Sequence, residues 1–364
     1  MSVLFNGFAI GDLKIKNRFM RSATWLGIAD ADGNCTARER ELLTDLARGE
    51  IGLVTTGHIA VTPNGRAGVG QLTLYRDKQI AGLKDMVASV HDSGAVVMAQ
   101  LSHAGVLASE KIIGDTPGGP SATDAFPHCH VLSELEIDGI TNSFAQAAYR
   151  AAEAGFDAIQ LHAAHGFLLS QFLSPLFNQR TDQYGGHFEN RARIVVETIR
   201  KIKKSIGNTC PVLVKLNSSD RTEGGLTVAE MLQIAVMLQI EGLDAIELSG
   251  GLLTSPDGSP CVTAVKPYED EAYFKREAEL LREAIDIPLI LVGGMRAFET
   301  MEYIVDENIA DMVSLSRPLI RQPQLVKQWR EGYQEPATCI SCNGCFAAAI
   351  QGQGAYCTVD KARL

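Results

Sequence analysis

The chain has 364 residues, 46% of them hydrophobic, and a formal net charge of −10, which fits a globular enzyme with a large core. No basic cluster is present, so nucleic acid or an anionic membrane is not expected as the main partner. The N-terminus has no basic start followed by an apolar run, and no segment is apolar over the ~18 residues of a membrane span. We therefore expect a cytoplasmic protein.

Short apolar runs alternate with helical patterns along the chain. Apolar residues spaced by three and four predict helices at 37–49, 78–94, 143–155 and 190–207. Strands are predicted at 19–24, 52–57, 95–101, 158–163, 211–217, 245–250, 288–294 and 312–317. Eight such alternations predict a (β/α)8 TIM barrel, with an open doubly wound sheet as the alternative. We expect the barrel at residues 1–333 and a short Cys-rich extension at 334–364.

One connection is unusually long. Residues 103–140 are rich in Gly, Pro and His and show no clear periodicity. Loops of this length in a compact domain are usually lids or binding loops. We expect this loop on the carboxyl face of the barrel, with His103, His128 and His130 as candidate contributors to a site.

Barrel active sites lie at the carboxyl ends of the strands. The predicted ends carry Ser22, Ala23, Thr24, Thr56, Gly57, Gln100, His162, His165, Lys215, Ser249, Gly250, Gly251, Gly293, Gly294, Ser316 and Arg317. The glycine pair after the seventh strand and the Ser-Arg pair after the eighth suit a phosphate, because backbone N–H groups and a guanidinium can close around it.

Two histidines follow the fourth predicted strand. His162 and His165 are three residues apart, so a helix beginning at Ala163 would place both imidazoles on one side of its first turn. Such a pair can bind a metal, or donate two hydrogen bonds to a carbonyl or nitro oxygen that gains negative charge.

Polar residues also end two apolar strands. Lys215 ends VLVKLN, where it could stabilise an anion such as a reduced flavin or act as a Schiff-base nucleophile. A lysine reaching the barrel rim is the structural alternative. Gln100 offers an amide that donates and accepts, which suits a ring edge carrying C=O and N–H groups.

Four cysteines gather near the C-terminus. Cys339, Cys342, Cys345 and Cys357 have the spacing Cys-x2-Cys-x2-Cys-x11-Cys. Ligands this close suit a cuboidal [4Fe-4S] cluster better than structural zinc, which usually takes two separated Cys-x2-Cys pairs. Zinc and free thiols remain the alternatives.

Several motifs resemble the old yellow enzyme family of FMN-dependent oxidoreductases. They are KIKNRFMRSATW at 14–25, GHIAVTPNGRAG at 57–68, AQLSHAG at 99–105 and LHAAHGFLLSQFLSPLFNQRTDQYGGHFENR at 161–191. The resemblance covers the barrel to about Trp329, and the cysteine segment resembles the 2,4-dienoyl-CoA reductase and amine dehydrogenase branch. It implies FMN held by Ser22, Ala23, Thr24, Gly57, Gln100, Lys215, Gly293, Gly294, Ser316 and Arg317.

The resemblance also implies a reaction. His162 and His165 would hold a substrate carbonyl oxygen, and reduced flavin would pass hydride to the β-carbon of an activated alkene such as an enone or enoyl compound. Relatives commonly carry a proton-donating tyrosine where this chain has Phe167, with Tyr184 as a candidate substitute. Lys215 stands where relatives usually carry arginine, so a cation is kept while bidentate geometry is lost.

Three other functions stay open. They are oxidation or demethylation of a methylated amine, a Schiff-base lyase using Lys215, and a subunit that only transfers electrons. Longer relatives of the branch continue into nucleotide-binding domains, whereas this chain ends at Leu364. Electrons are therefore expected from NADH or NADPH bound at the flavin, or from an electron-carrier protein, and the enzyme could be a homo-oligomer.

Overall fold

The computed structural model describes residues 2–360, and its central feature is a closed parallel barrel. Each neighbouring pair of barrel strands is parallel, and pairing of β4 with β6 closes the ring. The barrel strands are β3 (Phe19–Arg21), β4 (Leu53–Thr55), β6 (Val96–Ser102), β9 (Ala158–Ala163), β10 (Val212–Asn217), β11 (Ala245–Ser249), β12 (Leu289–Val292) and β13 (Met312–Leu315). All eight predicted strands are therefore confirmed, and the fold is a (β/α)8 TIM barrel.

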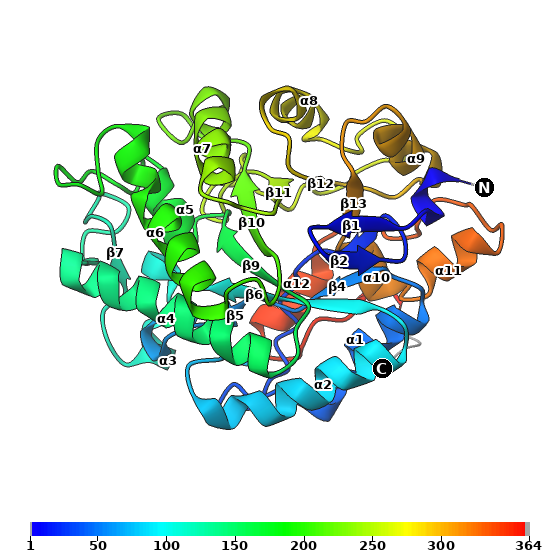
Figure 1. Cartoon of the computed structure of the whole chain (residues 1–364), viewed down its shortest axis with the longest axis horizontal. Helices are drawn as coiled ribbons and strands as arrows, with labels where there is room; N and C mark the ends of the chain where they lie inside the picture. The colour runs from blue at the N-terminus through cyan, green and yellow to red at the C-terminus, as the bar shows by residue number, and fades with distance from the viewer. Residues whose placement is uncertain (1, 361–364) are drawn as a thin grey trace.

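Helices connect successive strands and cover the outside of the barrel (Figure 1). The connecting helices are α1 (Ala37–Arg48), α2 (Ile80–Asp92), α4 (Glu134–Glu153), α6 (Phe188–Ile206), α7 (Val228–Ile240), α8 (Lys275–Ala284) and α9 (Phe298–Asp306), with α10 (Arg317–Arg321) and α11 (Leu325–Arg330) after the last strand. Their apolar faces pack on the strands, as the spacing of three and four requires. No helix among the described residues is long and apolar enough to cross a membrane.

The long segment after β6 is less irregular than expected. It contains α3 (Glu110–Ile113) and the short paired strands β7 (Gly118–Gly119) and β8 (His130–Val131). The expected loop to residue 140 was wrong at its end, because α4 already begins at Glu134. Its capping box explains the early start: Ser133 Oγ accepts from the Glu136 N–H while Glu136 accepts from the Ser133 N–H.

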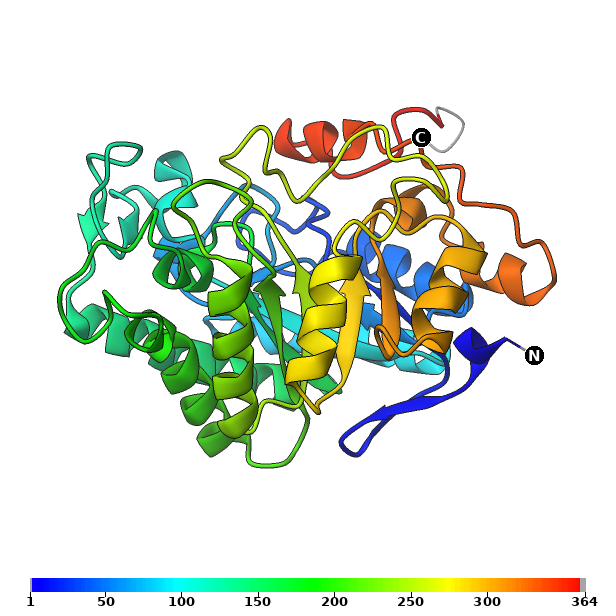
Figure 2. The same cartoon turned by 90° about the horizontal axis from the view of Figure 1, so that it is seen from above.

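The two ends of the barrel are closed differently. A hairpin of β1 (Phe8–Ile10) and β2 (Leu13–Ile15) contributes Ile10 and Ile15 to an apolar cluster at the amino end. The C-terminal tail, with α12 (Gly344–Ile350), crosses the opposite end, toward which the strands point (Figure 2). The tail is anchored there because the Ala355 N–H donates to the Leu26 carbonyl. The tail therefore covers the carboxyl end of the barrel.

Candidate active site

The barrel interior changes from apolar to polar along the strands. Inward side chains recur every second residue, so each strand contributes one residue to each layer. The first layer is apolar, with Met20, Met98, Ala158, Leu213, Ala245, Ile290 and Met312. Two residues further along, the inward positions are Ser22, Gln100, Gln160, Lys215, Glu247 and Ser314. This polar layer forms the floor of the site.

Glu247 is the centre of that floor. It is fully buried, and its carboxylate accepts from Ser22 Oγ at 2.7 Å, Lys215 Nζ at 3.0 Å, Ser314 Oγ at 2.8 Å and Gln160 Nε2 at 2.9 Å. Burial alone would raise the pKa of Glu247, but the Lys215 cation and these hydrogen bonds hold that pKa below its ordinary value. The carboxylate therefore stays ionised.

Lys215 is consequently a fixed cation. Its Nζ donates to Ser22 Oγ at 2.7 Å as well as to Glu247, and the side chain lines the cavity. These bonds favour the anion-stabilising role over the Schiff-base role, which needs a free amine. Gln100 joins the same network, since its Nε2 donates to Gln160 Oε1 at 2.7 Å.

The two predicted imidazoles lie side by side, with ring centroids 5.3 Å apart and planes at 83°. The expectation of a helix from Ala163 was wrong, because β9 runs to Ala163 and the next helix, α5 (Leu168–Leu173), begins five residues later. His165 instead turns in the left-handed conformation, φ 64°. Its N–H donates to Asn217 Oδ1 at 3.1 Å, which holds this uncommon backbone in place.

Both rings are neutral. Burial, followed by nearby cationic groups that include Lys215, holds the pKa values of His162 and His165 well below the usual range. His165 Nε2 lies 2.7 Å from Ser249 Oγ. His162 Nδ1 is buried without a hydrogen-bond partner among the described residues. An enclosed ring nitrogen without a hydrogen-bond partner carries a desolvation cost.

Two aromatic residues flank this pair. The Phe167 ring lies 4.3 Å from the His162 ring, between centroids, and 4.9 Å from the ring of His58. His58 follows β4 at the carboxyl end of the barrel and lines the same cavity. Burial lowers the pKa of His58 to about 4, so this third imidazole is also neutral. Sequence reasoning missed His58 and Glu247, although a histidine at a strand end and an acid inside AIELS were available signals.

The phosphate-suited residues line the same cavity. Gly293 and Gly294 have φ values of 138° and 71°, in the region that favours glycine. Ser316 Oγ lies 2.7 Å from Thr24 Oγ1. Arg317 Nη1 donates to the Val262 carbonyl at 2.8 Å and to Asn343 Oδ1 at 2.6 Å, so the guanidinium is tied to the loop before α8 and to the tail.

These groups surround one cavity of about 320 Å³. Of the predicted site residues, the cavity is lined by Ser22, Ala23, Thr24, Gln100, His162, His165, Lys215, Gly293, Gly294, Ser316 and Arg317. Gly57 is not among them. A Cβ at Gly57 would lie 2.9 Å from the Thr24 carbonyl oxygen, so its role is to allow close packing of β4 against the end of β3.

The loop histidines lie away from this cavity. His103 is buried, and its Nδ1 accepts from the Gly105 N–H at 3.0 Å. His130 is exposed and pairs with Glu136. Tyr184 is structural too, because its hydroxyl donates to Glu197 at 2.8 Å.

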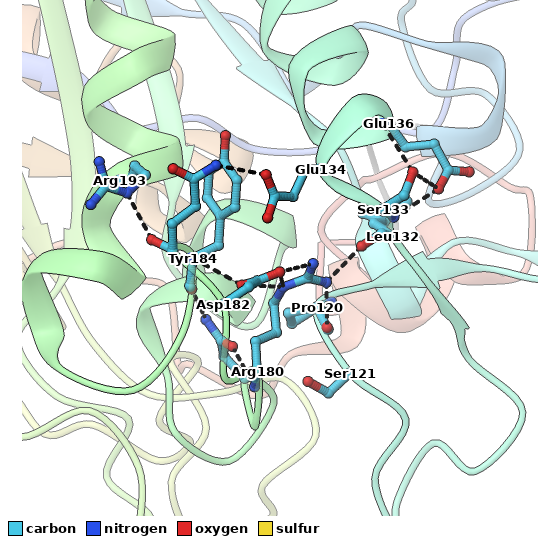
Figure 3. A network of polar contacts seen from close by, with 12 residues as sticks. Pro120, Ser121, Leu132, Ser133, Glu134, Glu136, Arg180, Asp182, Tyr184 and Arg193 are labelled. Atoms are coloured by element: carbon cyan, nitrogen blue, oxygen red, sulfur yellow. Dashed lines mark hydrogen bonds and ion pairs between the residues drawn. The ribbon is translucent and has the colours of Figure 1, made fainter.

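Arg180 fastens the long loop to the segment after α5 (Figure 3). Its Nη1 donates to the carbonyls of Pro120 and Leu132 at 3.0 and 2.6 Å, and its Nη2 lies 2.5 Å from Asp182. This explains part of the NQRTDQYGG motif, because the arginine links residues 120 and 132 of the long segment to the chain after α5.

The four tail cysteines gather at a second, smaller cavity of about 20 Å³, together with Arg317. Burial raises the pKa of Cys345, and neighbouring Cys339 and Cys342 raise it further. Among the described residues, no three His, Cys, Asp or Glu side chains are placed to share one metal ion. Cys345 lines both cavities, which makes the cysteine group and the barrel site direct neighbours.

A family model described as NADH:flavin oxidoreductase / NADH oxidase family matches residues 3–335. The chain therefore belongs to this family of FMN-dependent oxidoreductases, and it is an oxidoreductase enzyme. The resemblance to the old yellow enzyme family is confirmed.

The chain covers different shares of the length of the proteins it resembles. The chain is 36% identical to an NADH oxidase of Thermoanaerobacter brockii, over 98% of this chain and 56% of the relative. It is 31% identical to a 4,4'-dithiodibutanoate disulfide reductase of Rhodococcus erythropolis, over 96% of this chain and 93% of the relative. A 2-naphthoyl-CoA reductase structure superposes with a TM-score of 0.90 and 28% identity, over 96% of this chain and 56% of that one. The chain thus spans little more than half of some relatives.

Proposed function

We propose that this protein is an FMN-dependent reductase that acts on carbonyl-conjugated alkenes, such as enones or enoyl compounds. The observation that carries the proposal is the neutral His162–His165 pair in the same cavity as Lys215. A disulfide reductase among the relatives widens the range of acceptors, while a naphthoyl-CoA reductase among similar structures supports a double bond conjugated to a carbonyl group.

The residues present fit FMN. Among the residues that line the cavity, the Gln100 amide and the Lys215 cation suit a ring edge with C=O and N–H groups, and Gly293, Gly294 and Arg317 suit a phosphate. When bound, FMN would accept two electrons from NADH or NADPH and pass them on as hydride.

The chain's own residues then prepare the substrate. His162 and His165, both neutral, donate hydrogen bonds to the carbonyl oxygen, which draws electron density from the conjugated carbon. Asn217 keeps His165 in its left-handed turn, so the donor needs no reorganisation. Phe167 keeps water from one side of His162 but offers no proton.

We propose further that the tail cysteines bind a [4Fe-4S] cluster. All four thiols line one cavity, and Arg317 lines it with them. A cuboidal cluster binds each cysteine at a different corner, so its ligands do not converge on one ion. The cluster would carry single electrons to or from the neighbouring barrel site through Cys345 and its surroundings.

An anaerobic titration tests the main proposal. Purified protein should be yellow-brown, lose its flavin absorbance on addition of NADH or NADPH, and regain it when cyclohexenone is added. If no alkene reoxidised the flavin and a methylated amine reduced it, the amine dehydrogenase alternative would replace the proposal. If only an electron-carrier protein reduced the flavin, that protein would be the electron donor.

A further inference from the structure

His58 presents a single nitrogen to the substrate cavity. Its ring lies 6.1 Å from the His162 ring, between centroids, and beside Phe167. Nδ1 is engaged outside the cavity, 2.8 Å from Gln71 Nε2 and 3.3 Å from Ser102 Oγ. Among the described residues, Nε2 has no hydrogen-bond partner. It is not fully enclosed either, so part of its surface is accessible. Because His58 lines the cavity and its Nδ1 is engaged, Nε2 is the ring nitrogen available to a ligand there.

The orientation of the Gln71 amide fixes which nitrogen of His58 carries the proton. The Ala67 N–H can only donate, and it donates to Gln71 Oε1 at 2.7 Å. The Gln71 NH2 group therefore faces His58, where it also donates to the His58 carbonyl at 3.1 Å. Gln71 is fully buried, so this arrangement is not averaged by solvent. A donated bond at Nδ1 makes that nitrogen an acceptor and leaves the proton on Nε2.

We infer that His58 is a third substrate-binding imidazole, which donates its Nε2–H to a second acceptor oxygen of the substrate, and that Gln71 is the residue that positions this donor. The inference rests on the proposed reduction of conjugated carbonyl compounds and names the preferred class: substrates with an oxygen acceptor at each end of the activated double bond. The 6.1 Å between the His58 and His162 rings is a distance that a six-membered ring with two carbonyls can span.

Phe167 strengthens this assignment. Its ring touches both His58 and His162, so the wall between them is apolar and offers no competing hydroxyl. The other aromatic neighbour of His58 is Trp25, 6.2 Å away between ring centroids, and the indole N–H of Trp25 is enclosed. A second acceptor oxygen placed beyond Phe167 meets the His58 N–H directly.

The first test measures the tautomer of His58 directly and does not depend on turnover. In flavin-loaded enzyme labelled with nitrogen-15 histidine, NMR should show His58 protonated at Nε2 and bare at Nδ1. Gln71→Glu turns a carboxylate oxygen toward Nδ1, so the proton should appear at Nδ1, whereas Gln79→Glu, at another buried glutamine, should leave the His58 signal unchanged. A wild-type His58 protonated at Nδ1 would overturn the inference.

The second test compares cyclohexenone with the cyclohexenedione that carries a second carbonyl across the same double bond. One neutral hydrogen bond is worth about 1 kcal/mol, so His58→Phe should raise KM for the dione about 5- to 10-fold while KM for the monoketone stays within about 2-fold. His58→Gln, which keeps an N–H donor, should recover most of the loss. Equal losses for both compounds would overturn the role of His58. Reduction of neither compound by the wild type would instead refute the proposed function.

Discussion

Lys215 Nζ lies 3.0 Å from Glu247 Oε1, and the two side chains are only 5% and 0% exposed. An ion pair so completely removed from water costs desolvation energy, which only good geometry and further hydrogen bonds offset. Ser22, Ser314 and Gln160 supply those bonds to Glu247. The pair therefore holds a cation at a defined place in the barrel, as the proposed anion-stabilising role of Lys215 requires.

Breaking this pair should destabilise the fold. Lys215→Met leaves an unpaired buried carboxylate, and we expect a loss of about 3–5 kcal/mol in the free energy of unfolding. The double variant Lys215→Met/Glu247→Gln removes both charges and keeps an acceptor for the serines, so it should be more stable than Lys215→Met alone. Chemical denaturation in a double-mutant cycle measures this coupling. Additive losses would show that the two groups do not interact.

Restoring a hydroxyl beside His162 should speed reduction. Phe167→Tyr places a proton donor next to the histidine pair, and general acid catalysis typically contributes 10²–10⁴-fold. We expect reoxidation of the reduced flavin by cyclohexenone to rise about 10-fold or more in stopped-flow measurements. Phe126→Tyr, whose ring stacks on Phe177 outside the cavity, is the matched control. An unchanged rate would mean that protonation does not limit turnover.

The proposed cluster predicts a selective loss of iron. Cys342→Ala should remove iron and acid-labile sulfide while FMN remains bound, because Cys342 lines the small cavity and not the large one. Cys129→Ala, at a half-buried thiol whose Sγ donates to the His130 carbonyl, should keep full iron content. Metal analysis with flavin absorbance measures both. Iron at wild-type level in the Cys342 variant would refute the ligand assignment.

Glu39 should make stability fall as the pH rises. This residue of α1 is 2% exposed and its Oε2 has no hydrogen-bond partner among the described residues, so burial raises its pKa to about 8. Between pH ~4.5 and ~8 the unfolded chain has released a proton that the folded protein still holds, so stability is complete below this window and falls through it.

Glu39→Gln should remove this dependence. Relative to the wild type, the variant should gain stability by at most about 1.4 kcal/mol per pH unit across that window. Denaturation at pH 5 and pH 8 measures the gain, and Glu41→Gln, on the exposed side of the same helix, is the control. The same gain at both pH values would indicate a packing effect instead of a titration.

Periodicity predicted the barrel, because strand and helix patterns depend on neighbouring residues. Most of the predicted strand-end residues line one cavity for the same reason: parallel strands bring their carboxyl ends together. One failure was local, because the capping box of Ser133 and Glu136 starts α4 earlier than expected. The other failures depended on contacts between distant segments. The left-handed turn of His165 needs Asn217, 52 residues away. The role of Glu247 needs four donors, which come from β9, β10, β13 and the residue after β3. The tautomer of His58 likewise depends on an amide 13 residues later.

The tail does more than carry four thiols. Ser341, Asn343, Cys345, Phe346 and Ala355 form part of the wall of the barrel cavity, and Asn343 accepts a hydrogen bond from Arg317. Whatever rearranges the cysteines therefore rearranges the ceiling over the reducing site. If the proposed cluster were lost, movement of these tail residues would open the cavity to water and dioxygen, and a reduced flavin bound there would lose its electrons to dioxygen.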